Sequence, residues 1–441
     1  MIVSILKRYM KKVLSTLLLL LAVLTVWAQR INVREEVRAD RNKCSGLDAI
    51  YDCSPKAASA APKGYEAFYV SHYGRHGSRY AYTPRTYGMI VRMLKAEDEK
   101  DGLTEFGKQL YARMQAFNET AELRVGDLTP LGWEQHQFIA KTMINSFPAA
   151  FRKGARVDAV SSPTPRSIIS MGAFCVEVAR LRPNIAVYEH QGLIEMQATR
   201  PNTKNNPLQY KGPELINPYA ETSEEYFLRH FPTYKEVLGR MFKDTDRCLD
   251  GRTPFEVFFQ LYMLVGGMQS LPEDCRVDLD GLFTPEEFAI MWECDNYERF
   301  REYYEYKTAC SSIYDDMIAK ADARIAQGER GADLRFGHDH CLMTLLMIAD
   351  IEDFDTQPAN NDELCYWFQT FRSMMATNLQ LVFYAPKGWP KKQGDILVKL
   401  LFNGEDSRFG KLQTAQGPYY KWEDLKAYLN QRTRLFVNYN N

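Results

Sequence analysis

Three short stretches of the chain carry side chains that can act together on a phosphorylated group. The first is Arg75-His76-Gly77-Ser78-Arg79, the second is Arg166, and the third is His338-Asp339. Guanidinium groups packed together repel one another unless an anion lies among them, and phosphate or sulfate suits them because each presents several charged oxygens. An imidazole among the arginines is a candidate nucleophile. A carboxylic acid at the edge can protonate a departing alkoxide.

This chemistry needs no metal ion, because the guanidinium groups neutralise the charge that moves onto the phosphate oxygens as phosphorus is attacked. The sequence lacks the carboxylate clusters that hold magnesium or calcium. None of its Cys or His residues has zinc-site spacing. We therefore expect a site without a metal or other cofactor.

Each of the three stretches follows a segment that we expect to be a strand. Residues 65–70, 157–162 and 332–337 are apolar and rich in strand-forming residues, and Gly74 and Gly77 are expected to break the first of these strands. Helices separate the strands, which predicts an α/β fold with a mostly parallel central sheet flanked by helices. Ligands bind beyond the carboxyl ends of such strands, and all three stretches lie there.

The remaining segments complete this organisation. Further strands are expected at 185–188, 379–384 and 396–402, and Thr129 with Pro130 is typical of a helix start. Residues 29–62 look like an irregular arm. Residues 190–308 lose the strand pattern and are rich in Tyr, Phe, Met and Glu, which predicts a helical cap inserted between two parts of an α/β core, 29–189 and 309–441.

The composition is that of a globular protein, and the N-terminus looks like an export signal. Of 441 residues, 45% are apolar, and the net charge of -1 argues against a nucleic-acid binder that relies on bulk positive charge. Four cations precede an apolar run over residues 13–26, namely Lys7, Arg8, Lys11 and Lys12. This pattern predicts a signal peptide over residues 1–28 that is cleaved after Ala28. A membrane anchor is the alternative, although the run is short for a span.

Export places the protein in the periplasm or outside the cell, with no membrane span after cleavage, and permits disulfides. The nine cysteines include the close pair Cys44 and Cys53, and a group that could form two more bonds: Cys248, Cys275, Cys294 and Cys310. Their connectivity cannot be read from the sequence, and an odd number leaves at least one thiol unpaired.

The motifs together resemble the second branch of the histidine phosphatase superfamily, which comprises histidine acid phosphatases, phytases and multiple inositol polyphosphate phosphatases. Besides the Arg-His-Gly and His338-Asp339 motifs, four ordered pieces match: 128–132, 161–166, 334–339 and 398–404. The resemblance spans nearly all of the chain after residue 28.

The resemblance implies an exported phosphomonoester hydrolase that acts on inositol phosphates or other small organic phosphate esters. It implies that His76 is the nucleophile that forms a phosphohistidine and that Asp339 protonates the leaving group. The phosphate would be bound by Arg75, Arg79, Arg166 and His338. A non-catalytic protein that binds phosphate or phosphoesters in the same pocket is the alternative function. The sequence does not indicate an oligomeric state.

Some positions depart from the family pattern or lack an assigned role. Ala81 stands where the family often has proline, and His340 follows the acid motif, where we interpret it as packing or pointing away. We interpret Arg200 and Lys204 as parts of a solvated loop. His72 is interpreted as a hydrogen-bonded structural residue that orients the turn.

Overall fold

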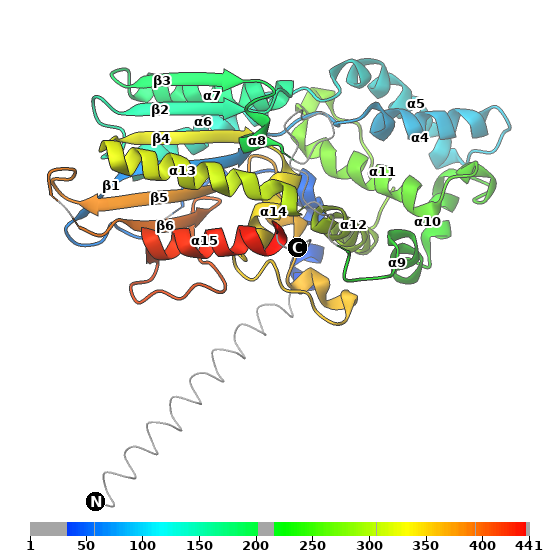
Figure 1. The fold of residues 1–441 in the computed structure, drawn as a ribbon. Helices are drawn as coiled ribbons and strands as arrows, with labels where there is room; N and C mark the ends of the chain where they lie inside the picture. Colours follow the sequence, from blue (N-terminus) through cyan, green and yellow to red (C-terminus); the bar gives the residue numbers. More distant parts are fainter. Residues whose placement is uncertain (1–32, 57, 202–215, 306, 393, 438–441) are drawn as a thin grey trace, which may run out of the picture.

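Eight strands form one mixed sheet in the computed structural model, which describes residues 33–437 apart from 57, 202–215, 306 and 393 (Figure 1). The strands are β1 (Tyr65–Arg75), β2 (Arg156–Ser161), β3 (Ala186–Gln191), β4 (Gly331–Gly337), β5 (Asn378–Pro386), β6 (Leu397–Phe402), β7 (Glu405–Ser407) and β8 (Tyr419–Lys421). Their order is β3-β2-β4-β1-β5-β6-β7, and β8 pairs with β6.

The first four strands in this order are parallel, and the rest of the sheet is antiparallel. β1 and β2 both pair in parallel with β4, whereas β5 runs antiparallel to β1 and β6 antiparallel to β5. The predicted α/β class with a central sheet is therefore confirmed. The parallel arrangement, however, covers only the half of the sheet that carries the three sequence motifs.

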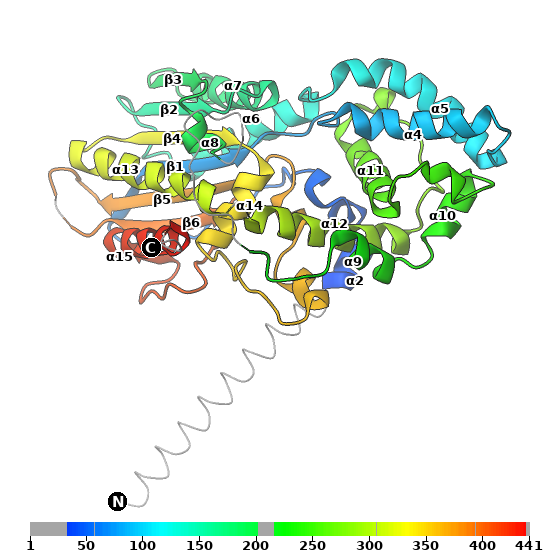
Figure 2. The ribbon, with the colours of Figure 1, turned by 45° about the vertical axis from the view of Figure 1, so that its right-hand side comes forward.

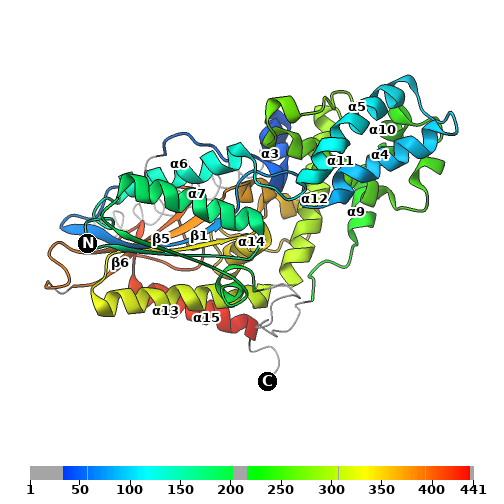
Figure 3. The same ribbon diagram turned by 90° about the horizontal axis from the view of Figure 1, so that it is seen from above.

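Fourteen helices of the described chain surround the sheet or form a second lobe. They are α2 (Val33–Ala39), α3 (Arg41–Cys44), α4 (Pro84–Asp98), α5 (Glu105–Ala121), α6 (Pro130–Ser146), α7 (Pro165–Leu181), α8 (Met196–Thr199), α9 (Ser223–His230), α10 (Tyr234–Met241), α11 (Pro254–Gly267), α12 (Pro285–Glu305), α13 (Ser311–Gln327), α14 (Asp339–Ile348) and α15 (Trp422–Val437). Seen from above, α6 and α7 cover one face of the sheet, and α13 and α15 cover the other (Figure 3).

The second lobe is helical and lies at the end of the sheet to which β1, β2 and β4 point (Figures 1 and 2). It contains more than the segment 190–308, because α4 and α5 pack on each other, α4 packs on α11, and α5 packs on α10. Helices α4 and α5, which lie in the range 29–189 that we assigned to the core, thus belong to the helical lobe. Helices α12 and α14 meet where the two lobes join (Figure 2).

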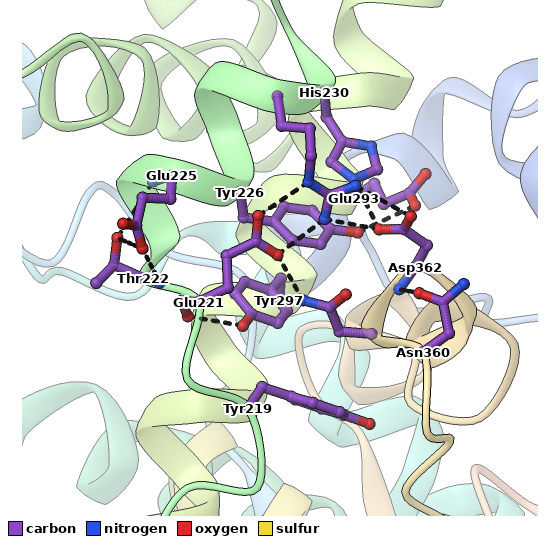
Figure 4. Close-up of polar contacts among 12 residues, drawn as sticks. Tyr219, Glu221, Thr222, Glu225, Tyr226, His230, Glu293, Tyr297, Asn360 and Asp362 are labelled. Carbon is purple, nitrogen blue, oxygen red and sulfur yellow. Dashed lines mark hydrogen bonds and ion pairs between the residues drawn. The ribbon is translucent and has the colours of Figure 1, made fainter.

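A cluster of aromatic and charged side chains holds α9 against α12 within this lobe (Figure 4). The ring of Tyr226 stacks on His230 and on Tyr297, with ring centroids 4.1 Å apart in each pair. The Nε2 atom of His230 lies 3.0 Å from an oxygen of Asp362, at the start of the 3₁₀-helix η7 (Asn361–Tyr366). These contacts join α9, α12 and η7 and use groups that do not line the pocket of the site.

Three expectations from the sequence differ from the structure. The arm is irregular only after Asp48, because its earlier part forms α2, α3 and the 3₁₀-helix η1 (Gly46–Asp48). The strand β1 continues through Gly74 to Arg75, because its pairing with β4 and β5 extends that far. The ring of His72 covers Gly74 and would lie 2.6 Å from an added Cβ atom. None of the nine cysteines, all of which lie in the described residues, forms a disulfide, so the expected disulfides are absent from the structure.

The expected signal peptide, residues 1–28, lies outside the described residues. Among the helices that are described, none combines the length and the apolar character needed to cross a membrane.

Candidate active site

The loop after β1 is held by close glycine contacts against the start of α6. A Cβ atom on Gly77 would lie 2.4 Å from the carbonyl oxygen of Gly132, and one on Gly132 would lie 2.3 Å from the carbonyl oxygen of Ser78. Thr129 caps α6 as predicted, and its hydroxyl also donates to Ser78 O at 3.1 Å. Gln135 accepts a hydrogen bond from Ser78 N at 2.9 Å. The helix start thus fixes the backbone on which the first motif lies.

His76 is buried at the carboxyl end of β1, with its ring oriented by the backbone. Its Nδ1 atom lies 3.0 Å from the carbonyl oxygen of Gly77. A carbonyl can only accept, so Nδ1 carries the proton and Nε2 keeps its lone pair. Burial, and after it the charges of Arg166 and Arg75, lower the pKa of His76 well below its ordinary value. The imidazole is therefore neutral, the form that can attack phosphorus.

Two of the three predicted arginines have protein partners. Arg75 is fully buried, donates to the carbonyl oxygens of Leu47 (2.5 Å) and Ser373 (2.7 Å), and lies 3.4 Å from Asp339 Oδ2. Arg79 lies 3.4 Å from Asp48 Oδ1. These contacts hold both guanidinium groups in place at the carboxyl end of β1.

Arg166, in the first turn of α7, is the least compensated of the three. Nε is buried without a hydrogen-bond partner in all three arginines, but the guanidinium of Arg166 also has no hydrogen bond or ion pair to any other described residue. Burial and then the guanidinium of Arg79 lower the pKa of Arg166 to about 9. Desolvation and repulsion between cations both destabilise its charge, and a bound anion would relieve both.

The third motif enters the site at the end of β4. His338 precedes α14, and its Nε2 atom lies 3.0 Å from the hydroxyl of Ser162 and 3.3 Å from that of Thr164. The centroid of its ring lies 5.5 Å from the centroid of the His76 ring. Burial, and then the charge of Arg200, lower the pKa of His338 well below its ordinary value.

Asp339 opens α14 and faces the same pocket as His76. Its Oδ2 atom lies 3.4 Å from both Arg75 Nη2 and Tyr303 Oη. Burial by itself would raise the pKa of Asp339, but Arg75 and then His340 outweigh it and hold this pKa well below the ordinary value.

All six predicted site residues therefore meet at one edge of the sheet. The pairing of β1 and β2 with β4 explains this, because Arg75 lies beside Gly337 and Ser161 lies beside Phe336 in the register. The structure corrects three other interpretations. His340 and Arg200 line the pocket, and His72 is buried in the core with no hydrogen-bond partner in the described structure. Lys204 lies outside the described residues.

The alanine at position 81 also has a structural explanation. The backbone N–H of Ala81 donates to the hydroxyl of Tyr87 at 2.7 Å. Proline has no N–H and would lose this bond. The departure from the family pattern therefore coincides with a contact between the first motif and α4.

The rest of the pocket wall comes from segments that carry no sequence motif. Asp48 belongs to the arm, and α12 contributes Asp295, Arg299, Glu302 and Tyr303. Arg299 lies 3.2 Å from Asp295 and 2.9 Å from Glu302. Burial raises the pKa of Asp295 to about 7, with the charge of Arg299 opposing it. Charged residues at i and i+3 or i+4 occur on many exposed helices, so this spacing does not identify a pocket.

The arrangement can bind a tetrahedral anion and transfer it. Guanidinium groups surround a neutral imidazole whose lone pair is free, and a carboxyl group lies at the edge of the same pocket. Pre-positioned cations stabilise the charge that develops on phosphate oxygens during attack. The chemistry that fits is nucleophilic transfer of a phosphoryl group.

Comparisons with known proteins identify the fold. No protein-family model matches the sequence, and no curated protein is significantly similar to it. The multiple inositol polyphosphate phosphatase of Bifidobacterium longum, solved with inositol hexasulfate, matches with a TM-score of 0.70 and 17% identity over 88% of this chain and 97% of that one. The phytase from D. castellii matches with a TM-score of 0.62 and 13% identity over 91% of this chain and 88% of that one. The resemblance to histidine acid phosphatases of the second branch is thus confirmed at the level of the fold.

Proposed function

We propose that this protein is a phosphomonoester hydrolase that works through a phosphohistidine on His76. The observation that supports the proposal most is the state of this residue. Its imidazole is buried and neutral, with Nδ1–H directed to Gly77 O, and it lies among Arg75, Arg79 and Arg166. A site that only bound phosphate would gain more from a charged imidazole than from a neutral one.

In the first half of the proposed reaction, the phosphate group of the ester lies among the arginines. The lone pair on Nε2 of His76 attacks phosphorus, the N–P bond forms, and the P–O bond to the alcohol breaks. Arg75, Arg79 and Arg166 stabilise the charge on the remaining phosphate oxygens. Asp339 delivers a proton to the departing alkoxide.

In the second half, water attacks the phosphohistidine. The new P–O bond forms, the N–P bond breaks, and its electron pair returns to Nε2 of His76. Asp339, now a carboxylate, accepts a proton from the attacking water. Inorganic phosphate leaves and the site returns to its starting state.

We propose inositol phosphates or other organic phosphate esters as substrates. The structural neighbours named for inositol polyphosphates and phytate support the first class. The pocket itself is mixed in charge, since Asp48, Asp295 and Glu302 line it together with Arg200 and Arg299. In an ester with one phosphate and several hydroxyl groups, the phosphate could bind to the arginines and the hydroxyl groups could donate hydrogen bonds to the carboxylates. Turnover of inositol hexakisphosphate, a sugar phosphate and an aryl phosphate, compared side by side, separates these classes.

We also propose that the protein works outside the cytoplasm, in the periplasm or beyond the cell, because residues 1–28 have the pattern of a signal peptide. N-terminal sequencing of the secreted protein tests this, with Gln29 expected as the first residue.

Replacing His76 tests the proposed function. We expect His76→Ala to lose at least about a thousandfold in kcat on an aryl phosphate, because the covalent route is removed. The matched control is His190→Ala, an exposed histidine on β3, which should retain wild-type turnover. Full activity of His76→Ala would reject the nucleophile. Absence of turnover in the wild type, together with calorimetric binding of inorganic phosphate, would favour the non-catalytic binding protein.

A further inference from the structure

His340 lies directly beside the carboxyl group that must supply a proton in the proposed reaction. Its Nδ1 atom is 3.5 Å from Asp339 Oδ1, and its side chain, 19% exposed, lines the pocket. Its ring is almost parallel to that of His338, at 9° and 5.4 Å between centroids. The imidazole is therefore oriented by a buried neighbour while it remains open to the pocket.

The two oxygens of Asp339 have different surroundings. Oδ2 faces Arg75 and the hydroxyl of Tyr303, each at 3.4 Å, whereas Oδ1 faces His340. Arg75 keeps its proton at any working pH. Burial raises the pKa of Tyr303 well above its ordinary value, so its phenol is a poor proton source. Among the described neighbours of Asp339, His340 is the one whose ring nitrogen faces Oδ1, and an imidazole nitrogen can either donate or accept a proton.

The proposed reaction nevertheless requires a proton on Asp339 when the alkoxide leaves. The cations around Asp339 hold its pKa well below the ordinary value, so the isolated carboxyl group is ionised in the free site. His76 and His338 are both kept neutral and cannot supply the missing proton. The proton must therefore be held by a group adjacent to Asp339.

We infer that His340 is a positioning and proton-relay residue, and that its Nδ1 atom shares with Asp339 Oδ1 the proton that is delivered to the leaving group. Before transfer, this proton resides on the pair. As the P–O bond breaks, the proton moves from Asp339 to the alkoxide oxygen, which leaves Asp339 ionised and His340 neutral. When water attacks the phosphohistidine, one of its protons returns to the pair. The inference rests on the proposed function.

Charged and titratable groups from three parts of the chain line the pocket together with His340. Asp339 lies on the same helix, α14, and His338 directly precedes it. Helix α12 provides Glu302 and also Tyr303, whose ring centroid is 6.4 Å from that of His340. Arg200 lines the pocket after α8.

Leaving-group dependence tests the relay. An alkyl phosphate needs a proton on its departing oxygen, whereas 4-nitrophenyl phosphate releases a stable anion. For His340→Asn, which can donate from a similar position but cannot change its charge, we expect the ratio of alkyl to aryl kcat to fall about 10- to 100-fold, within the range of general acid catalysis. The pH dependence of kcat on the alkyl substrate should also change, while that on the aryl substrate stays close to the wild type.

The ratio is measured within one preparation, so it does not depend on the fraction of folded enzyme. His340→Gln provides a second variant with the same expectation, and His190→Asn is the control with an unchanged ratio. Equal losses on both substrates would show a merely structural role and overturn the inference, as would an unchanged alkyl rate. Failure of the wild type to turn over either substrate would instead reject the proposed function.

Discussion

At the scale of single residues, the site combines a neutral imidazole with guanidinium groups that differ in the protein partners that stabilise their charge. Arg75 bonds to backbone carbonyls and to Asp339, whereas Arg166 carries a pKa lowered to about 9 by burial and by Arg79. The described part of the protein supplies no hydrogen-bond or ion-pair partner for the guanidinium of Arg166. A bound anion therefore stabilises this charge more than that of an arginine that already has protein partners. Replacing Arg166 should therefore weaken phosphate binding without lowering the stability of the fold.

We expect Arg166→Ala to weaken the inhibition constant for inorganic phosphate about 10- to 100-fold, since a hydrogen bond between charged groups contributes about 1.5–3 kcal/mol. The free energy of unfolding should stay equal or rise, because a desolvated cation beside Arg79 is removed. Arg180→Ala, on the same helix but exposed and paired with Glu177, is the control and should leave phosphate inhibition unchanged. Loss of stability without loss of affinity in Arg166→Ala would show that the guanidinium supports the fold and not the ligand.

The sequence identified these residues because their types are rare in combination and because they follow predicted strands. It did not identify Arg200, His340 or the wall on α12. Arg200 and His340 lack a motif of their own, and their orientation depends on tertiary contacts, namely the stacking of His340 on His338 and the hydrogen bond from Arg200 to Thr164. His72 was misinterpreted because an imidazole beside a turn suggests hydrogen bonding, whereas here its ring covers Gly74 and packs 5.5 Å from both Phe174 and Phe336.

At the scale of elements, the contact between α6 and the loop after β1 sets the position of His76, the proposed nucleophile. The backbone of Gly132 lies so close to Ser78 and Gly77 that neither glycine has space for a side chain. Thr129 was correctly predicted as the helix cap from its type and from Pro130. The close approach itself has no local sequence signal, since a glycine in the first turn of a helix is compatible with many environments.

We expect Gly132→Ala to destabilise the protein by about 1–3 kcal/mol, the usual cost of overpacking, and to lower kcat by displacing His76. Gly172→Ala, on α7, provides the matched control, because no atom lies within 4 Å of the Cβ position there. That variant should gain up to about 1 kcal/mol from better helix propensity and keep its activity. Chemical denaturation and aryl phosphate turnover measure both effects. Equal stability and equal turnover in Gly132→Ala and Gly172→Ala would contradict the claim that the contact of Gly132 with the loop after β1 positions His76.

At the scale of the whole molecule, the parallel half of the sheet directs three chain segments toward a helical lobe that covers the site. The sequence predicted the parallel half, because helices alternate with strands there. It did not predict the antiparallel half, since the direction of β5 depends on a long connection that places it beside β1. Nor did it predict that α4 and α5 belong to the helical lobe, because amphipathic patterns do not specify the partner of a helix.

The core beneath the site should make the fold sensitive to acid. His72 and His136 are buried without hydrogen-bond partners in the described structure, and burial lowers the pKa of each to about 3. In the unfolded chain a histidine titrates near 6.5. Between these values the unfolded state binds more protons, so the free energy of unfolding falls as the pH falls from about 6.5 toward 3.

At pH 4.5 each of these histidines should cost about 2–3 kcal/mol relative to pH 7, at 1.36 kcal/mol per pH unit. His136→Phe keeps a ring that packs on Phe336 and should reduce the loss by about 2 kcal/mol. Urea unfolding at both pH values measures this difference, and His190→Phe, at an exposed position, should leave it unchanged. An identical loss in His136→Phe and the wild type would contradict a neutral buried His136.

The central claim is that His76 becomes covalently phosphorylated during turnover, and trapping that intermediate tests it most directly. The protein is mixed rapidly with a phosphorus-labelled aryl phosphate, quenched without acid and digested, and the label is located by mass spectrometry. The proposed function predicts label on His76 within the first turnover, together with a burst of aryl alcohol, and no label in His76→Ala. Label on another residue, or a burst of alcohol with no labelled protein, would contradict it.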